Sequence, residues 1–324
     1  MQQREKLLQV ENLSTSFSTP SGRIRVLEDI NFDLEQGEVL GIVGESGSGK
    51  SVTALSILRL LTGTSGRVDT GRVLFNGTNL LELSEEQMRG IRGNNISMIF
   101  QDPMTSLNPV IRIKAQIFES ILLHQKVSRE EALNQTINVL KAVNLSEINR
   151  VLTGFSFQFS GGQRQRIMIA LGVVCKPSIL IADEPTTALD VTIQAQILEL
   201  MEQLKQNTGT SIILITHDLG VIAELCDRVV VMYCGRIVEK GSVYDLFDSP
   251  ANPYSQGLLA SIPKLGIRAE ALEYIPGNVP NPHHIPKGCK FAPRCKYVTD
   301  ICRAEEPGFY EVSPGHYSKC WRHL

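Results

Sequence analysis

The stretch Gly44–Ser51 holds the residues of this chain that are best suited to bind phosphate. It follows the pattern G-x-x-x-x-G-K-S. Glycines let the backbone curl until successive N–H groups face phosphate oxygens. Lys50 adds a positive charge for the β- and γ-phosphates, and Ser51 carries a hydroxyl suited to Mg²⁺. We predict a nucleotide site, rather than a Gly/Ser-rich turn before a helix, at Gly44, Glu45, Ser46, Gly47, Ser48, Gly49, Lys50 and Ser51.

Two carboxylates follow a second apolar run. Residues 179–182 are Ile-Leu-Ile-Ala, and Asp183 and Glu184 come next. A buried strand that ends in Asp183 can hold Mg²⁺, while Glu184 faces another way because strand side chains alternate. We therefore expect Glu184 to polarise an attacking water; the alternative is a solvated turn.

Two further predicted strands end in side chains that can reach a nucleotide. Gln101 follows the apolar run 96–100, and Pro103 ends that element. Gln101 could reach Mg²⁺ or the attacking water, although a surface glutamine is the ordinary alternative. His217 follows the run 211–216 and is a candidate for the γ-phosphate.

A second glycine-rich helix start precedes the apolar helix expected over 164–174. Serine and glycines at such a start bind anions through backbone N–H groups. Because the first loop already serves its own phosphates, we expect this one to bind the nucleotide of a neighbouring subunit. Its residues are Ser160, Gly161, Gly162 and Gln163.

The elements around these residues indicate an α/β protein. An apolar run at 39–43 predicts a buried strand before the phosphate loop, and helical spacing over 52–61 predicts a helix after it. Residues 7–40 read as an antiparallel β region, with a hairpin turn at Asn76-Gly77. Phe17 in that region could stack on adenine or simply pack in the core.

The pattern of residues 110–151 is typical of amphipathic helices and offers no candidate catalytic or binding residue. It predicts a helical insertion in the α/β domain. Apolar residues recur there at helical spacing, beginning with Ile113, Ile117, Ile121 and Leu122.

Composition and charge argue against several classes of protein. The chain has 324 residues, a formal net charge of −2 and a pI near 6.3, which gives no reason to expect nucleic acid as a partner. Residues 1–6 are polar, unlike a signal peptide, and no apolar run reaches the ~18 residues that span a bilayer. We expect a cytoplasmic protein that docks on a membrane partner.

Four of the seven cysteines fall within the last 36 residues. Chance clustering and structural Zn²⁺ are alternatives, but zinc sites favour close C-x₂₋₄-C pairs, which this tail lacks. The wider spacings suit an iron–sulfur cluster that bridges separate loops. A tail rich in Pro and Gly buries little core, so a metal staple would stabilise it. The predicted ligands are Cys289, Cys295, Cys302 and Cys320.

Five motifs in this order resemble the ATP-binding subunit of an ABC transporter. They are GESGSGKS at 44–51, FQDP at 100–103, FSGGQ at 159–163, ILIADEPTTALD at 179–190 and ITHD at 215–218. The resemblance covers residues 7 to about 245, and FSGGQ is its most specific part. It implies a P-loop NTPase cassette at 1–250, with a mixed central sheet, an antiparallel β region and a helical subdomain at about 84–155.

The resemblance also assigns roles. It implies two ATP molecules held between two cassettes, with Ser160 and Gly162 of one cassette closing the site of the other. It places Asp190 among the nucleotide-binding residues. Hydrolysis would use Glu184, His217 and Gln101, with Mg²⁺ on Ser51, Gln101 and Asp183.

Two segments resemble the dipeptide and oligopeptide importer subfamily: DPMTSLNP at 102–109 and NPYSQGLLASIP at 252–263. In that subfamily a C-terminal extension, here 251–324, is associated with a [4Fe–4S] cluster on four cysteines; Zn²⁺ is the alternative cofactor. Phe159 replaces the usual leucine, and Ser156 replaces a usual proline.

The expected protein is therefore an ATP-hydrolysing importer subunit, peripheral on the cytoplasmic face of the membrane. Its expected partners are a second cassette, usually a paralogue, two transmembrane permease subunits and an extracytoplasmic substrate-binding protein. The alternatives are a soluble cassette ATPase acting on nucleic acid or ribosomes, and a nickel or glutathione importer subunit. A redox-regulated switch is a third possibility.

Overall fold

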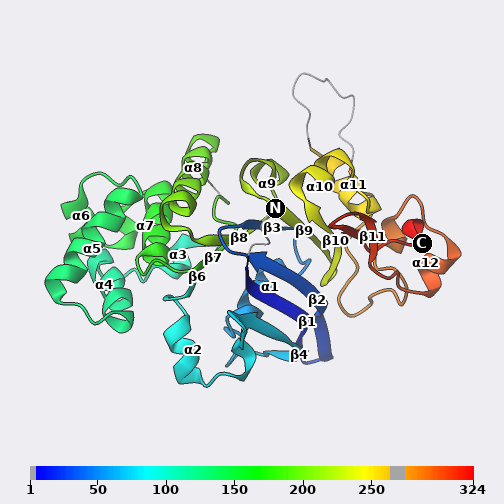
Figure 1. Ribbon diagram of the computed structural model, residues 1–324, viewed down its shortest axis with the longest axis horizontal. Coiled ribbons are helices and arrows are strands. Elements are labelled where there is room, and N and C mark those ends of the chain that lie inside the picture. Colours follow the sequence, from blue (N-terminus) through cyan, green and yellow to red (C-terminus); the bar gives the residue numbers. More distant parts are fainter. Residues whose placement is uncertain (1–4, 188, 263–273) are drawn as a thin grey trace. The chain divides into compact units, whose positions relative to one another are not determined.

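The computed structural model describes residues 5–187, 189–262 and 274–324 (Figure 1). Its contacts divide the chain into two compact units. The first unit consists of Met1–Glu35, Val39–Leu81 and Ile215–Leu324, and the second of Gln36–Glu38 and Glu82–Leu214. Ala188 and Pro263, which belong to two of the motifs, lie outside the described residues.

An antiparallel sheet in the first unit confirms the predicted β region. Its strands lie in the order β2–β1–β4–β5 and are β1 (Lys6–Thr19), β2 (Gly22–Glu35), β4 (Gly66–Phe75) and β5 (Thr78–Asn79). The predicted hairpin joins β4 to β5. Asn76 and Gly77 have φ values of 47° and 76°, as a two-residue turn between twisted strands requires.

The other described strands of the first unit include both parallel and antiparallel pairs. They lie in the order β11–β12–β10–β9–β3 and are β3 (Val39–Val43), β9 (Arg228–Tyr233), β10 (Arg236–Ser242), β11 (Tyr310–Ser313) and β12 (His316–Ser318). β3 and β9 are parallel, and the remaining pairs are antiparallel. The tail therefore adds its own strands to the sheet, next to β10.

The described helices of the first unit are short. They are α1 (Lys50–Ile57), α9 (Leu219–Leu225), α10 (Val243–Asp248), α11 (Pro253–Ala260) and α12 (Asp300–Ala304), with 3₁₀ turns at Leu80–Glu82, Ala292–Arg294 and Trp321–His323. α1 is shorter than the helix predicted over 52–61. It stops at Ile57 because Arg59 has a left-handed backbone, with φ 52°, which an α-helix does not accommodate.

The second unit combines strands with a group of helices. Its strands are β6 (Ile96–Ile99), β7 (Ile179–Asp183) and most of β8 (Ser211–Thr216). Its helices are α2 (Glu85–Ile91), α3 (Pro103–Ser106), α4 (Ile113–His124), α5 (Arg129–Ala142), α6 (Ile148–Thr153), α7 (Gly161–Val173) and α8 (Val191–Thr208), with a 3₁₀ turn at Ser156–Gln158. β6 and β7 are parallel, and each strand confirms a predicted apolar run.

Helices α4, α5 and α6 pack against one another (Figure 1). Ile113, Ile117 and Ile121 are buried as predicted, but Leu122 is 40% exposed. Leu122 follows Ile121 directly, and one residue turns a helix by about 100°, away from the buried stripe. Among the described residues, no helix has the length and apolar content that crossing a bilayer requires.

Candidate functional site

Strand β3 leads into the phosphate loop, and α1 begins at the end of the loop. All residues of β3 are buried, so the entry to the loop is fixed by the core. Gly44 and Gly49 have φ values of 153° and 104°, which glycine adopts most readily. A Cβ on Gly44 would clash with the Met232 carbonyl oxygen, and one on Gly49 would lie 2.6 Å from Leu27 Cδ2. The loop can curl this tightly only with glycine at both positions.

The side chains of the loop fit an anion. Lys50 is 6% exposed, and its Nζ donates hydrogen bonds to the carbonyl oxygens of Gly44 at 2.8 Å and Glu45 at 3.2 Å. The buried Ser48 hydroxyl has no hydrogen-bond partner among the described residues. Ser51 lies in the first turn of α1, at the positive end of the helix. A phosphate would offer acceptors to these donors.

The structure places the other predicted residues of the first unit as follows. His217 is exposed and directly follows β8, and the neighbouring Asp218 caps α9 through the Gly220 N–H at 2.8 Å. Phe17 pairs with Gly66 across the antiparallel sheet and is half-buried. Both interpretations of Phe17, adenine stacking and core packing, therefore stay predictions.

In the second unit, one carboxylate oxygen of Glu184 accepts two hydrogen bonds. Gln101 Nε2 and Thr187 Oγ1 each donate to Glu184 Oε2 at 2.8 Å. Two donors on one oxygen fix the orientation of the carboxylate. Sequence reasoning brought Gln101 and Glu184 to one site but missed Thr187. A hydroxyl three residues after a strand-end acid is the signal that could have found it.

Asp183 and Glu184 do not belong to the same element, as the expected alternation along one strand would require. Asp183 is the last residue of β7 and is 4% exposed. Glu184 lies beyond the strand and has a left-handed backbone, with φ 48°. Because Glu184 lies in the turn after β7, the alternation of strand side chains does not apply to it. A left-handed glutamate is uncommon, and such conformations concentrate at functional sites.

The second glycine-rich helix start is exposed and caps itself. Ser160 Oγ accepts the Gln163 N–H at 3.3 Å, and Gln163 Oε1 accepts the Ser160 N–H at 3.1 Å. This capping box begins α7. Gly162 approaches α8, since a Cβ there would lie 3.0 Å from Ile193 Cγ2. Asp190 Oδ1 accepts the Ile193 N–H at 3.0 Å and so caps α8.

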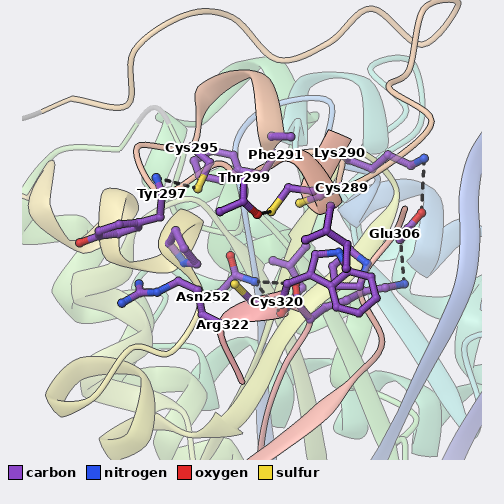
Figure 2. A pocket seen from close by; sticks show the side chains of 18 of the residues that line it. Asn252, Cys289, Lys290, Phe291, Cys295, Tyr297, Thr299, Glu306, Cys320 and Arg322 are labelled. Atoms are coloured by element: carbon purple, nitrogen blue, oxygen red, sulfur yellow. Dashed lines mark hydrogen bonds and ion pairs between the residues drawn. The ribbon is translucent and has the colours of Figure 1, made fainter. Parts of the chain in front are cut away.

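In the first unit, the four tail cysteines line one cavity of about 250 Å³. Figure 2 shows Cys289, Cys295 and Cys320 on its walls, and Cys302 Sγ lies 3.2 Å from Thr299 Oγ1. The seven cysteines of the chain form no disulfide. Sequence reasoning grouped these four by their density, and the structure brings them to one place.

Burial raises the pKa of three of these thiols. The pKa of Cys289 is raised to about 11, first by burial and then by the neighbouring cysteines. Burial likewise raises the pKa of Cys295 and of Cys320, while Arg322 acts in the opposite direction on both. These thiols are therefore protonated at neutral pH in this structure, and a metal would have to displace their protons.

The predicted metal staple is not formed by the side chains in this conformation. Within residues 5–187, 189–262 and 274–324, no three His, Cys, Asp or Glu side chains are placed to hold a metal ion. Tetrahedral zinc would bring the cysteine sulfurs to about 3.8 Å from one another. Direct protein contacts also hold the tail, among them the ion pairs of Glu306 with Lys290 at 3.3 Å and Lys319 at 3.2 Å.

Two family models match the chain. The model described as ABC transporter matches residues 27–187, and that for the C-terminal region of oligopeptide/dipeptide transporters matches residues 238–302.

Two curated proteins are similar to the chain over nearly its whole length. The oligopeptide transport ATP-binding protein OppD of Escherichia coli (strain K12) is 48% identical, over 99% of this chain and 94% of that protein. The dipeptide transport ATP-binding protein DppD of Bacillus subtilis (strain 168) is 48% identical, over 98% of this chain and 95% of that protein.

Solved structures match the cassette part. The dimeric post-hydrolysis state of the ATP-binding cassette MJ0796, bound to ADP and Pi, gives a TM-score of 0.66 at 26% identity, over 73% of this chain and 98% of that chain. CbiO1 of Clostridium perfringens, part of the transporter complex cbiONQ, gives a TM-score of 0.63 at 27% identity, over 76% and 92%.

Proposed function

This chain belongs to the ATP-binding subunits of oligopeptide and dipeptide ABC transporters, and from this premise we propose that it drives the import of short peptides. The family match at 27–187 assigns ATP hydrolysis, and the match at 238–302 assigns the peptide transporter subfamily. The observation that carries the proposal is the near full-length identity of 48% to both an oligopeptide and a dipeptide transport protein.

The proposed hydrolysis uses the residues that the sequence predicts for this role. Lys50 and the N–H groups of the phosphate loop bind the phosphates, and Ser51, Gln101 and Asp183 are the proposed ligands of Mg²⁺. When bound, Mg²⁺ neutralises charge on the phosphoryl oxygens. The protein's remaining role is to position the water and the γ-phosphate, because phosphoryl transfer to water needs little covalent chemistry from the protein.

Glu184 is the proposed base. Its carboxylate orientation is fixed by Gln101 and Thr187, so it can orient a water and accept its proton without reorganising. We assign His217 to the γ-phosphate because it directly follows β8.

A second cassette completes the proposed site. Ser160 and Gly161 are exposed, and Gly162 and Gln163 lie beside them at the start of α7. An exposed, capped helix start is suited to close over a nucleotide held elsewhere. We propose that it meets the ATP of a partner cassette, most simply a paralogue, as the subfamily usually has.

The proposed assembly is a peripheral one on the cytoplasmic face of the membrane. Two permease subunits would receive the motion of the cassettes, and an extracytoplasmic binding protein would deliver the peptide. We retain the proposed division into a cassette at 1–250, with a helical subdomain at about 84–155, and an extension at 251–324.

We also propose that the extension holds a [4Fe–4S] cluster. The support is the convergence of Cys289, Cys295, Cys302 and Cys320 on one cavity, since thiolates are the usual ligands of such clusters. Iron, sulfide and zinc analysis of anaerobically purified protein, with its visible spectrum, tests this. A colourless protein loaded with zinc would overturn the assignment.

The function is tested on the reconstituted assembly. The chain is co-purified with its permease subunits, placed in vesicles with the binding protein, and assayed for ATP hydrolysis with di- and oligopeptides. We expect peptide-stimulated ATPase and peptide uptake. Stimulation by nickel or glutathione alone would reassign the cargo, and co-purification with RNA or DNA in place of permeases would favour the soluble ATPase.

A further inference from the structure

Side chains of the C-terminal region hold the second residue of the phosphate loop. Arg294 donates to both carboxylate oxygens of Glu45, from Nη1 to Oε2 at 2.7 Å and from Nη2 to Oε1 at 2.9 Å. The Tyr254 hydroxyl accepts the backbone N–H of Glu45 at 2.8 Å. Side chain and backbone of one loop residue are thus fixed from outside the loop.

Arg294 has no freedom to leave this position. Its side chain is 4% exposed. Besides Glu45, it donates to the carbonyl oxygens of Pro276 at 3.0 Å and Ile275 at 3.3 Å, and to the Tyr233 hydroxyl at 3.4 Å. A guanidinium has five N–H donors in a rigid plane, and this one makes five hydrogen bonds. Lysine could not reproduce the geometry.

Aromatic rings pack around the buried Arg294 end of this contact, while the Glu45 side chain is 29% exposed. Tyr233, Tyr254 and Phe291 pack with ring centroids 4.6 to 5.4 Å apart. They share a buried cluster with Val43, the last residue of β3, and Cys289 and Cys295 pack against that cluster. Burial of the guanidinium strengthens its charged hydrogen bonds relative to those of a fully solvated pair.

The ion pair matters for an anionic ligand. The Glu45 carbonyl also accepts from Lys50 Nζ, so Glu45 connects Arg294 to the lysine of the loop. Without Arg294, the loop would lose a restraint, and an uncompensated carboxylate would stand beside the site of a polyanion. Both consequences weaken nucleotide binding.

We propose that Arg294 is a positioning residue of the nucleotide site, through which the C-terminal extension holds the phosphate loop in its ATP-binding conformation. The proposal rests on the assignment of this loop to ATP. It makes the extension a part of the nucleotide site, with Arg294 acting only through Glu45.

Nucleotide binding by the full chain tests the proposal. We expect Arg294→Gln to raise the Kd for MgATP about 10-fold, the effect of losing a charged hydrogen bond. Arg294→Lys should recover part of this, because it restores the charge but not the fork. Tyr254→Phe should raise the Kd about 3-fold. The matched control is Arg303→Gln, an exposed arginine beside Cys302, which should stay within about 2-fold.

A double-mutant cycle separates positioning from general destabilisation. In a Glu45→Gln background, Arg294→Gln should change the Kd less than about 2-fold. At saturating ATP, the transporter carrying Arg294→Gln should keep its kcat within about 2-fold, since uniform binding is what is lost.

Specific results would overturn the proposal. They are unchanged Kd values in folded Arg294→Gln and Tyr254→Phe, or equal effects of Arg294→Gln with and without Glu45. If Arg294→Gln fails to fold, Tyr254→Phe alone decides. A wild-type chain that binds no MgATP would instead overturn the nucleotide assignment itself.

Discussion

Two glycine-rich helix starts in this chain are built in opposite ways. The phosphate loop before α1 is partly buried, curls through glycines with positive φ, carries the buried Lys50, and is held from outside by Arg294 and Tyr254. The start of α7 is exposed, and neither Gly161 nor Gly162 has a positive φ. Its side-chain cap consists of the reciprocal hydrogen bonds of Ser160 and Gln163.

The difference separates a complete anion site from half of one. The first start combines backbone donors, a cation and a rigid frame, so it can hold phosphate within a single chain. The second offers a helix terminus whose serine is already used as a cap. We propose that its ligand is presented by another surface, as in the cassette dimer proposed above.

Replacing Lys50 would test the complete site most directly. We expect Lys50→Ala to lower ATP turnover of the assembled transporter by about 10³-fold, as seen when a preorganised charge-stabilising donor is lost. Nucleotide binding by the single chain should weaken too. ATPase assays and nucleotide titrations measure both, with Lys141→Ala on the exposed face of α5 as the control. Near-normal turnover would remove the loop from this role.

Changing Glu184 should separate chemistry from binding. Glu184→Gln keeps the shape of the side chain but cannot accept a proton, so turnover should fall about 10²-fold or more while ATP still binds. Single-turnover hydrolysis and ATP binding by the same preparation measure this. A variant that hydrolyses ATP at the normal rate would show that another group activates the water.

A change at the start of α7 should alter ATPase activity only in the assembled transporter. In Gly162→Ala, the new Cβ would lie 3.0 Å from Ile193 Cγ2, and the start of α7 must shift. We expect about 10-fold slower ATPase in the assembled transporter, since small misplacements are costly in a reacting site, and unchanged ATP binding by the single chain. Gly90→Ala in α2, where a Cβ meets open space, is the control. Weaker ATP binding by the single Gly162→Ala chain would contradict the distinction between the two helix starts.

Thr187 should have a smaller effect. Thr187→Val removes the hydroxyl that donates to Glu184 Oε2 with little change in shape. Turnover should fall about 3-fold to 10-fold, the range for one lost hydrogen bond, with an unchanged KM for ATP. Thr208→Val at the end of α8 is the control, and a wild-type rate for Thr187→Val would leave Gln101 as the effective restraint on Glu184.

The attachment of the tail should depend on pH. His316 is buried on β12, and its hydrogen bond to Glu239 at 2.7 Å raises the pKa of His316 above the ordinary 6.5. A raised pKa stabilises the fold below pH 6.5, and that contribution is lost as pH rises through the raised value. His316→Gln should therefore lower the unfolding free energy by about 1–2 kcal/mol in acid and less in alkali. Denaturant titrations across this range measure the difference, and a constant gap would contradict it.

The local parts of the site can be predicted from the sequence. β7 ends in Asp183 as predicted, β8 ends where its apolar run ends, and the phosphate loop joins β3 to α1 as expected. Such features follow from short patterns, because glycine spacing and apolar runs act over a few residues. The length of α1 was harder to predict, since the left-handed backbone of a single residue, Arg59, ends the helix.

Long-range contacts could not be read from local pattern. Arg294 and Glu45 are 249 residues apart, and nothing near either residue indicates its partner. The density of tail cysteines predicts that they gather, and they do, but it does not predict what they bind. Thr187 lies between these cases, since its distance from Glu184 is local while its hydrogen bond depends on the turn.

The shared packing of Val43, Tyr233, Tyr254 and Phe291 limits how this subunit can be recombined. A version that kept the first 250 residues and lacked the rest would expose Tyr233, remove the arginine that pairs with Glu45 and leave the β10 edge without β12. Breakpoints for chimeras, and boundaries for shortened versions, should therefore keep the first and last stretches of the chain from the same parent.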